Sequence, residues 1–549
     1  MKVWIRTAIF CLLLGIPVLA GPARLSAGAI NNDARTVAHI LNRIGYGARP
    51  GDVEKVRAIG LDRYIDEQLH PDRIPDSAAA SRLAGLTSIT MNSREIAEKY
   101  ERPLEELRRQ RAANGRQDAP PARGAGAPGV SNDAPPAMQD PVQQRAQAVV
   151  LELSEQKILR AIYSERQLQE VLTDFWFNHF NVDARKGPDR FMLTEYERET
   201  IRPHVLGKFR DLLDATAKSP AMLFYLDNWM STDPNGPHMD PRAARGRIAR
   251  GPFGPVFIPP RMPQQQNPNN MRRGLNENYG RELMELHTLG VDGGYTQKDV
   301  TEVARALTGW TIQNPRQGGG FRFEPRLHDE GQKIVLGHVI KAGGGESDGR
   351  QVLDILATHP STARFIATKL VRRFVSDTPP QALVDRAAKR FGETGGDIRE
   401  VMRTILTSQE FLSPDAYRAK VKTPFEFIVS AMRSTVADVG DAMPLVRAIN
   451  QLGMPLYQCQ PPTGYKDTAD AWVNTGALVN RMNVALRLAN GQMPRVSVER
   501  DQLPADGDAM IARLLGGEAS ETTRATIAKA STPPQMAALT LGSPEFQRR

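Results

Sequence analysis

Apolar residues recur at the spacing of a helix through most of the chain. After Asp33, four of them fall on one face of an expected helix: Val37, Ile40, Leu41 and Ile44. The segment from Pro141 to Val182 continues the pattern over a length that favours two helices with a break near Ser164. Further helical segments follow from Asp348 to the end of the chain. The pattern predicts a mainly α protein, built as a multi-helix globular array.

The periodicity changes in the segment 311–340. The stretches TIQNP, FRFEP and KIVLGHVI have alternating or β-rich character and are separated by Gly and Pro. Such alternation is typical of short strands with one buried face. We therefore expect a small β-ribbon near residues 311–340, inserted into the helical array. Within it, Leu327–Lys333 forms a compact polar turn with the sequence LHDEGQK.

The stretch 275–310 combines clear helix signals with a high density of polar residues. Asn276 is a residue type that caps helices, and a glycine follows Leu289, so a first helix is predicted between these two positions. After a tight turn, Thr296 caps a second helix, and Asp299 three residues later approximates a capping box. We refer to residues 276–289 as the central helix.

Two stretches lack any helical pattern. Residues 108–144 are rich in Pro, Ala and Gly and cannot bury enough apolar surface to fold alone, which predicts a disordered insertion. Residues 231–273 contain seven arginines among many Pro, Gly, Gln and Asn residues, which predicts a basic flexible loop. The remaining segments are N-terminal helices at 30–107, a helical core at 145–230, and a region at 274–549 that carries the ribbon and belongs to the same domain as 145–230.

The N-terminus indicates where the protein resides. Lys2 and Arg6 precede an apolar run from Ala8 to Ala20, and small residues follow up to Ala29, which is the pattern of a secretory signal peptide at residues 1–29. No later run approaches the roughly 20 apolar residues that a membrane-spanning helix needs. We therefore expect an exported protein, periplasmic or extracellular, with no transmembrane segment in the mature chain.

Composition and charge narrow the functional classes. The chain is 40% hydrophobic and 24% charged, as is ordinary for a globular protein, and its formal net charge is +9. Its arginine-rich loop lacks the interleaved aromatic residues of a nucleic-acid reader, and export argues further against that role, so we expect no nucleic-acid partner. Removal of Cys11 with the signal peptide leaves Cys459 without a second cysteine for an intramolecular disulfide.

Candidate site residues come from the DFWFNHFNV segment, the central helix with the turn after it, the LHDEGQK turn and the loop that contains Tyr465. The segment DFWFNHFNV mixes aromatic and polar residues, so its polar side chains either bind a ligand or hydrogen-bond the backbone of an aromatic core. The residues with the chemistry for acid–base catalysis are His179, Glu282, His328 and Asp329. The residues with the chemistry for ligand binding are Asn178, Asn181, Asn278, Glu285, His287 and Tyr465.

A metal site is the less favoured interpretation of these residues. Its candidate ligands are Glu282, Glu285, His287 and Asp292. Glu282 and His287 are five residues apart, about 500° of helical rotation, so their side chains diverge, and no His-Glu-x-x-His motif is present. Asn278 shares a helix face with the two glutamates and would suit a hard cation, but the same helix also offers ordinary ion pairs. The sequence identifies no cofactor, and a divalent cation is the one that these residues would take.

Taken in order, the motifs resemble a bacterial family called domain of unknown function 1800. They include HILNRIGYG, DFWFNHFNV, NENYGRELMELHTLGVDGGYTQKDVTEVARALTGW, HDEGQKIVLG and LGMPLYQCQPPTGYKDTADAW. The resemblance covers residues 33–70 and 144–549, apart from the basic loop. It implies an exported, mostly helical protein, often encoded beside a sulfatase-like companion, and it implies no reaction. The chain departs from the family pattern at Gly280, where Ala is usual, and at Tyr465, where Trp is usual.

Two functional hypotheses remain. The favoured one is an exported binding or scaffold protein that acts with an extracytoplasmic partner, such as a sulfatase-like companion. The alternative is a metal-dependent or acid–base hydrolase, with a site formed by the central helix, the FNHFN segment (177–181) and the HDEG turn (328–331). No Gly-x-Ser-x-Gly elbow, phosphate-binding loop or dinucleotide fingerprint appears, which disfavours those chemistries. Whether the protein is an enzyme is left open by the sequence.

Overall fold

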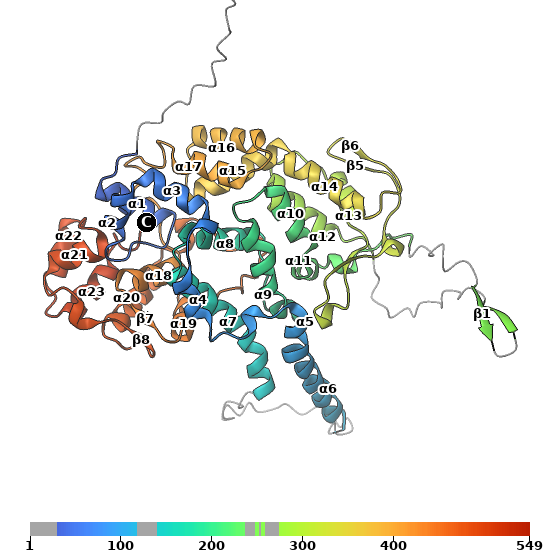
Figure 1. Cartoon of the computed structure of the whole chain (residues 1–549), viewed down its shortest axis with the longest axis horizontal. Coiled ribbons are helices and arrows are strands. Elements are labelled where there is room, and N and C mark those ends of the chain that lie inside the picture. Colours follow the sequence, from blue (N-terminus) through green and yellow to red (C-terminus); the bar gives the residue numbers. More distant parts are fainter. Residues whose placement is uncertain (1–29, 118–139, 237–246, 252–253, 259–273) are drawn as a thin grey trace, which may run out of the picture.

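The computed structural model describes residues 30–117, 140–236, 247–251, 254–258 and 274–549. Helices dominate this part of the chain, and the strands form two-stranded antiparallel ribbons (Figure 1). The expectation of a mainly α fold is therefore confirmed. The predicted signal peptide, residues 1–29, lies outside the described residues.

The first third of the chain follows the predicted helix pattern closely. Asp33 caps the first helix by accepting a hydrogen bond from the Thr36 amide at 2.8 Å, and Ser164 marks the break between two long helices. These helices are α1 (Ala34–Arg43), α2 (Asp52–Ile59), α3 (Leu61–Leu69), α4 (Ser77–Leu83), α5 (Ser93–Ile96), α6 (Arg102–Gln117), α7 (Pro141–Tyr163) and α8 (Gln167–His179). Residues 108–117 and 141–144 are thus helical where a disordered insertion was predicted, and 118–139 lie outside the described residues.

The central helix forms with the predicted caps. Asn276 Oδ1 accepts hydrogen bonds from two amides of the first turn, and Thr296 and Asp299 make a complete capping box. The elements here are α9 (Leu193–Glu195), α10 (Phe209–Lys218), α11 (Pro220–Tyr225), α12 (Glu277–Met284) and α13 (Gln297–Ala306). One feature differs from the expectation, because residues Glu285–Leu289 continue α12 as a π-helical turn up to Gly290. Such π-helical turns are rare and occur mostly as single turns within α-helices.

Gly280 lies where α12 and α13 approach each other. A Cβ atom at this position would be 2.9 Å from the carbonyl oxygen of Val300 and 3.2 Å from the amide nitrogen of Ala304. Since real Cβ contacts are longer than 3.0 Å, an alanine would push the two helices apart. The glycine therefore permits a closer helix contact than the alanine that is usual in the resembled family.

The predicted ribbon near 311–340 is two short hairpins. One pairs β3 (Trp310–Ile312) with β4 (Phe321–Phe323), and the other pairs β5 (Lys333–Val335) with β6 (His338–Ile340). Within the predicted basic loop, β1 (Arg247–Gly251) pairs with β2 (Gly254–Ile258), while 237–246, 252–253 and 259–273 lie outside the described residues. A last pair joins β7 (Asp438–Val439) to β8 (Val496–Ser497).

The C-terminal half is helical and wraps back onto the N-terminal helices. Its elements are α14 (Glu346–Thr358), α15 (Pro360–Phe374), α16 (Gln381–Glu393), α17 (Ile398–Leu406), α18 (Pro424–Ser434), α19 (Met443–Gln451), α20 (Thr475–Ala489), α21 (Gly507–Leu515), α22 (Glu521–Ile527) and α23 (Pro533–Gly542). In Figure 1, α8 lies near the centre, with α20–α23 on one side and α12–α14 on the other. On α15, Ile366, Leu370 and Phe374 recur at intervals of four and form a fully buried stripe.

One large hydrophobic core connects most of the described helices, and a smaller cluster at α5, α6 and the start of α7 is separate from it. The large core runs from Val37 in α1 to Phe546 near the C-terminus and includes residues of α8, α12, α15 and α18. The last residues return to the middle of the chain, because Lys420 and Arg549 exchange backbone hydrogen bonds. Among the helices described, none is both long and apolar enough to cross a membrane.

Candidate functional site

The C-terminal end of α8 holds the polar residues of the DFWFNHFNV segment. Phe175, Trp176, Phe177 and Phe180 are all buried, and their rings contact one another or neighbouring aromatic side chains. These aromatic anchors fix the backbone from which the polar side chains project. The position of each polar group in this segment is therefore determined by the core.

Two asparagines of this segment bind the backbone of a distant loop. Asn178 donates from Nδ2 to the carbonyl of Tyr465 at 2.8 Å and accepts the Tyr465 amide at 2.7 Å. Asn181 donates from Nδ2 to the carbonyls of Cys459 and Pro461, both at 2.9 Å. We call residues 459–465 the docked loop. The amide groups of Asn178 and Asn181 thus hydrogen-bond the backbone of the docked loop. This is the second of the two interpretations given for the DFWFNHFNV segment, in which its polar side chains bind backbone groups instead of a ligand.

Tyr465 and Gly464 complete the contact between α8 and the docked loop. The Tyr465 hydroxyl donates to the Pro455 carbonyl at 2.7 Å, and its ring lies 6.0 Å from the Trp472 ring. Gly464 has φ of +72°, and a Cβ there would lie 2.6 Å from Asn178 Oδ1 and closer still to the Asn178 carbonyl oxygen. Only glycine suits both this backbone conformation and this close approach.

His179 connects the central helix to α15. Its Nε2 lies 3.1 Å from the carbonyl oxygen of His287, and its Nδ1 lies 2.8 Å from Lys369 Nζ. Since a carbonyl only accepts, Nε2 carries the proton, and Nδ1 accepts from the Lys369 amine. Burial, reinforced by Lys369, holds the pKa of His179 well below its usual value, and the same causes lower that of His287 to about 3. Both histidines are therefore neutral at neutral pH.

A cavity of about 280 Å³ opens beside these groups. It lies between the end of α8, α15 and residues 454–468, and we call it the α8 cavity. Residues lining it include Asp174, Asn178, His179, Lys369, Arg372 and Tyr465. Three predicted site residues thus meet in one place, and α15 adds Lys369, Arg372 and Arg373, which sequence reasoning missed. The available signal was the basic pattern KLVRRF, which puts Lys369 and Arg372 three residues apart on one helix face.

The charge of the α8 cavity is not balanced. Its acids are already paired, because Asp174 binds Lys157 at 2.6 Å and Asp467 lies 3.6 Å from Arg373. Lys369 and Arg372, by contrast, have no carboxylate within 4.0 Å among the described residues, and Arg372 Nε is buried without a hydrogen-bond partner. Burial lowers the pKa of Lys369 to about 8. Two unpaired cations in a partly enclosed cavity are suited to an anionic group.

The central helix contributes to a second, wider cavity of about 670 Å³. Asn278 and Glu282 line it together with Gln460 and Pro462 of the docked loop. Burial and the neighbouring Glu285 raise the pKa of Glu282 above its usual value. The docked loop therefore lines both cavities and lies where two of the predicted segments meet.

The metal candidates have separate surroundings. Glu285 accepts a hydrogen bond from the Tyr295 hydroxyl at 3.1 Å, Asp292 is exposed in its turn, and the His287 ring packs on Phe180. Glu282 faces the wider cavity while His287 is buried in the core, so the two side chains diverge as their spacing indicated. Within the described part of the chain, no three His, Cys, Asp or Glu side chains converge as metal ligands.

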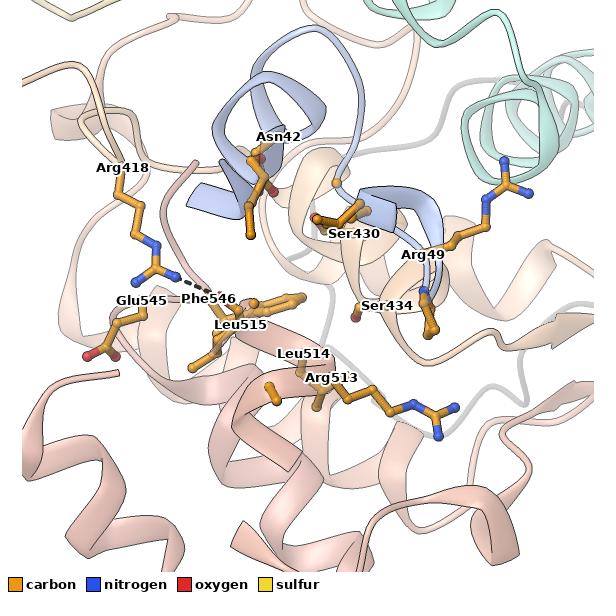
Figure 2. A pocket seen from close by; sticks show the side chains of 18 of the residues that line it. Asn42, Arg49, Arg418, Ser430, Ser434, Arg513, Leu514, Leu515, Glu545 and Phe546 are labelled. Atoms are coloured by element: carbon orange, nitrogen blue, oxygen red, sulfur yellow. Dashed lines mark hydrogen bonds between the residues drawn. The ribbon is translucent and has the colours of Figure 1, made fainter. Parts of the chain in front are cut away.

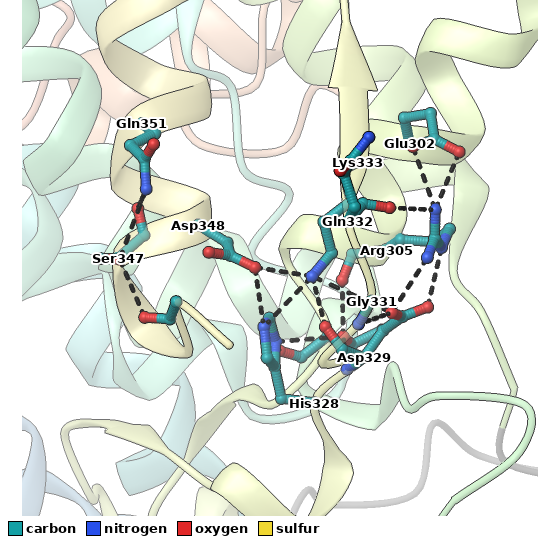
Figure 3. A network of polar contacts seen from close by, with 12 residues as sticks. Glu302, Arg305, His328, Asp329, Gly331, Gln332, Lys333, Ser347, Asp348 and Gln351 are labelled. Carbon is teal, nitrogen blue, oxygen red and sulfur yellow. Dashed lines mark hydrogen bonds and ion pairs between the residues drawn. The ribbon is translucent and has the colours of Figure 1, made fainter. Parts of the chain in front are cut away.

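The HDEG turn belongs to a buried ionic network (Figure 3). His328, Lys333 and Asp348 are fully buried, with His328 Nε2 at 3.2 Å and Lys333 Nζ at 2.6 Å from Asp348 Oδ2. Asp329 forms a two-fold contact with Arg305 at 2.7 and 3.0 Å. This network joins α13, β5 and α14, and its residues do not line either cavity described above. His328 and Asp329 thus have structural partners apart from the α8 cavity.

Comparison with known proteins assigns the family. Searches of the curated proteins and of the solved structures found no match. A family model described as protein of unknown function (DUF1800) matches residues 39–548, nearly the whole chain. This range contains the α8 cavity, the docked loop and the buried network. The chain therefore belongs to the DUF1800 family.

Proposed function

We propose that this is an exported binding protein whose α8 cavity accepts an anionic group of its ligand. The observation that carries the proposal is the pair Lys369 and Arg372, which line the cavity and have no carboxylate partner within 4.0 Å among the described residues. Export rests on the N-terminal sequence pattern. A sulfatase-like companion stays the proposed partner, on the basis of the family resemblance.

The size of the cavity defines the ligand group. Small-molecule pockets usually have volumes of about 300 to 1,000 Å³, so a cavity of about 280 Å³ suits one charged group and the few atoms next to it. Carboxylate, sulfate and phosphate share the oxygen acceptors that ammonium and guanidinium groups bind. Each hydrogen bond to a charged group contributes about 1.5 to 3 kcal/mol. Loss of either cation should therefore weaken binding by about 10- to 100-fold.

A second candidate function is an acid–base enzyme that uses the same cavity. It is favoured by the contact of Lys369 with neutral His179 and by the lowered pKa of Lys369, near 8. A lysine with such a pKa has a neutral fraction that takes up a proton near physiological pH. In this second candidate function, Lys369 is the general base, and the HDEG turn takes no part in the reaction.

Isothermal titration of the mature protein with sulfate tests the binding proposal. We expect sulfate to bind the wild type, and Lys369→Met or Arg372→Met to weaken it by at least tenfold. Arg364→Met is the matched control, because Arg364 lies on the same helix but is exposed and pairs with Asp385 at 3.0 Å. Equal sulfate affinity in the wild type and in both cavity variants would overturn the proposal.

The Lys369→Arg variant separates the two functions. Arginine keeps the charge but does not act as a base at neutral pH. Hydrolysis of p-nitrophenyl acetate, phosphate or sulfate by the wild type that disappears in Lys369→Arg, while sulfate still binds, would identify the acid–base enzyme. Sulfate binding in both proteins, without turnover in either, would identify the binding protein.

A further inference from the structure

A separate cavity of about 490 Å³ lies where the two ends of the described chain meet (Figure 2). Its walls come from the corner that joins α1 to α2, from α18 and α21, and from residues 545–548. We call it the α1–α21 cavity. Its residues are distinct from those of the α8 cavity.

Lys422 lines this cavity and is only 4% exposed. Its ammonium group has no hydrogen-bond acceptor among the described residues and lies over the Phe546 ring, 3.9 Å from the ring centroid. The nearby carboxylate of Glu426 is held by Arg373 at 2.7 Å and Arg549 at 3.0 Å. Burial lowers the pKa of Lys422 to about 7. A buried ammonium without an acceptor is unfavourable unless something else binds it.

Three of the other charged groups that line the cavity have partners. Arg418 donates to the carbonyls of Leu515 and Glu518 at 2.9 and 3.1 Å, as Figure 2 shows for the first of these. Arg49 pairs with Glu165 at 2.8 Å. Glu545 accepts from the Thr523 hydroxyl at 2.8 Å. Lys422 is therefore the buried cation in this wall whose charge is left unmatched.

One part of the wall is apolar. It includes Ala38, Val53, Leu514, Leu515 and Phe546. A ligand that fills this cavity therefore meets one buried positive charge and this apolar patch, and Asn42, Ser430 and Ser434 also line the cavity. A single ammonium matches a single negative charge, as in a carboxylate.

We propose that the α1–α21 cavity is a second ligand site, which takes a small carboxylic acid with an apolar body. Lys422 binds the carboxylate, and the apolar body packs against Leu514 and Phe546. The volume of about 490 Å³ is in the usual range for small-molecule pockets. The proposal is independent of the anion site in the α8 cavity, because the two sites share no residue.

Titration of the mature protein with octanoate tests this site. We expect octanoate to bind, octanol to bind at least tenfold more weakly, and Lys422→Met to lose at least tenfold in octanoate affinity. Lys55→Met is the control, because Lys55 is on α2 beside the cavity but is exposed and pairs with Glu165. Absence of octanoate binding, equal binding of octanol, or full affinity in Lys422→Met would each overturn the proposal.

Loss of binding must be separated from loss of fold. Removing an unmatched buried charge should leave the unfolding midpoint of Lys422→Met equal to or above that of the wild type. If this variant does not fold, Val53→Trp replaces it, since it fills the cavity and leaves Lys422 in place. Octanoate binding lost in folded Val53→Trp supports the site, and binding retained at full affinity contradicts it.

Discussion

Substitution of Gly464 by alanine should release the docked loop from α8. Gly464 has φ of +72°, and its added Cβ would lie 2.6 Å from Asn178 Oδ1. The positive φ alone costs an alanine about 1 to 2 kcal/mol. The clash then separates the Asn178 side chain from the Tyr465 backbone, where it makes two hydrogen bonds at 2.7 and 2.8 Å. Each such bond contributes about 0.5 to 1.5 kcal/mol, so the docked state loses about 2 to 5 kcal/mol.

Gly453 provides a matched control for this experiment. Its φ is +90°, and a Cβ there would meet no atom within 4 Å, so Gly453→Ala adds backbone strain without the clash. Amide hydrogen exchange of residues 459–468 measures whether the loop is docked. We expect faster exchange and weaker sulfate binding in Gly464→Ala, and wild-type exchange at these residues in Gly453→Ala. Unchanged exchange in Gly464→Ala would refute the reasoning.

Three further predictions concern stability and are measured by urea unfolding. Gly280→Ala should destabilise the protein despite a gain of about 1 kcal/mol in helix propensity, because its Cβ would lie 2.9 Å from the Val300 carbonyl. The control is Gly392→Ala in α16, which should be neutral or stabilising because no atom lies within 4 Å of the added Cβ. A Gly280→Ala variant more stable than Gly392→Ala would contradict the close contact between α12 and α13. Lys333→Met should cost about 3 to 5 kcal/mol, because it removes a cation from buried Asp348. The double variant Lys333→Met/Asp348→Leu should recover most of the lost stability, and its sulfate affinity should equal that of the wild type. Weaker sulfate binding without a loss of stability would instead show that the His328–Lys333–Asp348 network takes part in ligand binding. Lowering the pH from 7 to 5 should remove stability through His39 and His287, because they have native pKa values of about 3 and take up protons near pH 6.5 only when unfolded. Each histidine contributes up to about 1.4 kcal/mol per pH unit, while Glu101 and Glu155, whose pKa values burial raises to about 8 and about 7, contribute in the opposite direction. The test is therefore the slope of stability against pH in His39→Gln or His287→Gln compared with the wild type, and an unchanged slope would show that the replaced histidine is not buried and neutral.

Local signals predicted much of the fold. The Asn276 cap, the Thr296–Asp299 capping box and the break at Ser164 all appear at the predicted residues, because each depends on neighbours a few positions away. The π-helical turn at Glu285–Leu289 was not predicted, since its sequence resembles that of an ordinary α-helix. The single expected ribbon is two hairpins, because the alternating pattern does not specify which strands pair.

The candidate site was less predictable because its contacts join distant residues. Lys369 binds His179 across 190 positions, and Asn178 binds Tyr465 across 287. The sequence pattern identified three residues of the α8 cavity by their polar chemistry but had no means of pairing them with α15. Likewise, His328 and Asp329 have the chemistry of a catalytic pair, while their actual partners, Asp348 and Arg305, lie on two other elements.

The pH dependence of sulfate affinity tests the proposed α8 anion site most directly. The charge of sulfate is constant at neutral and alkaline pH, whereas Lys369, with a pKa near 8, loses its proton as the pH rises. The account predicts that wild-type affinity falls by up to about tenfold per pH unit between pH 8 and 9.5. In Lys369→Arg, which stays charged, affinity should remain nearly constant over the same range. A wild-type affinity that does not change with pH, or an equal fall in Lys369→Arg, would contradict the assignment of Lys369 as the anion-binding group.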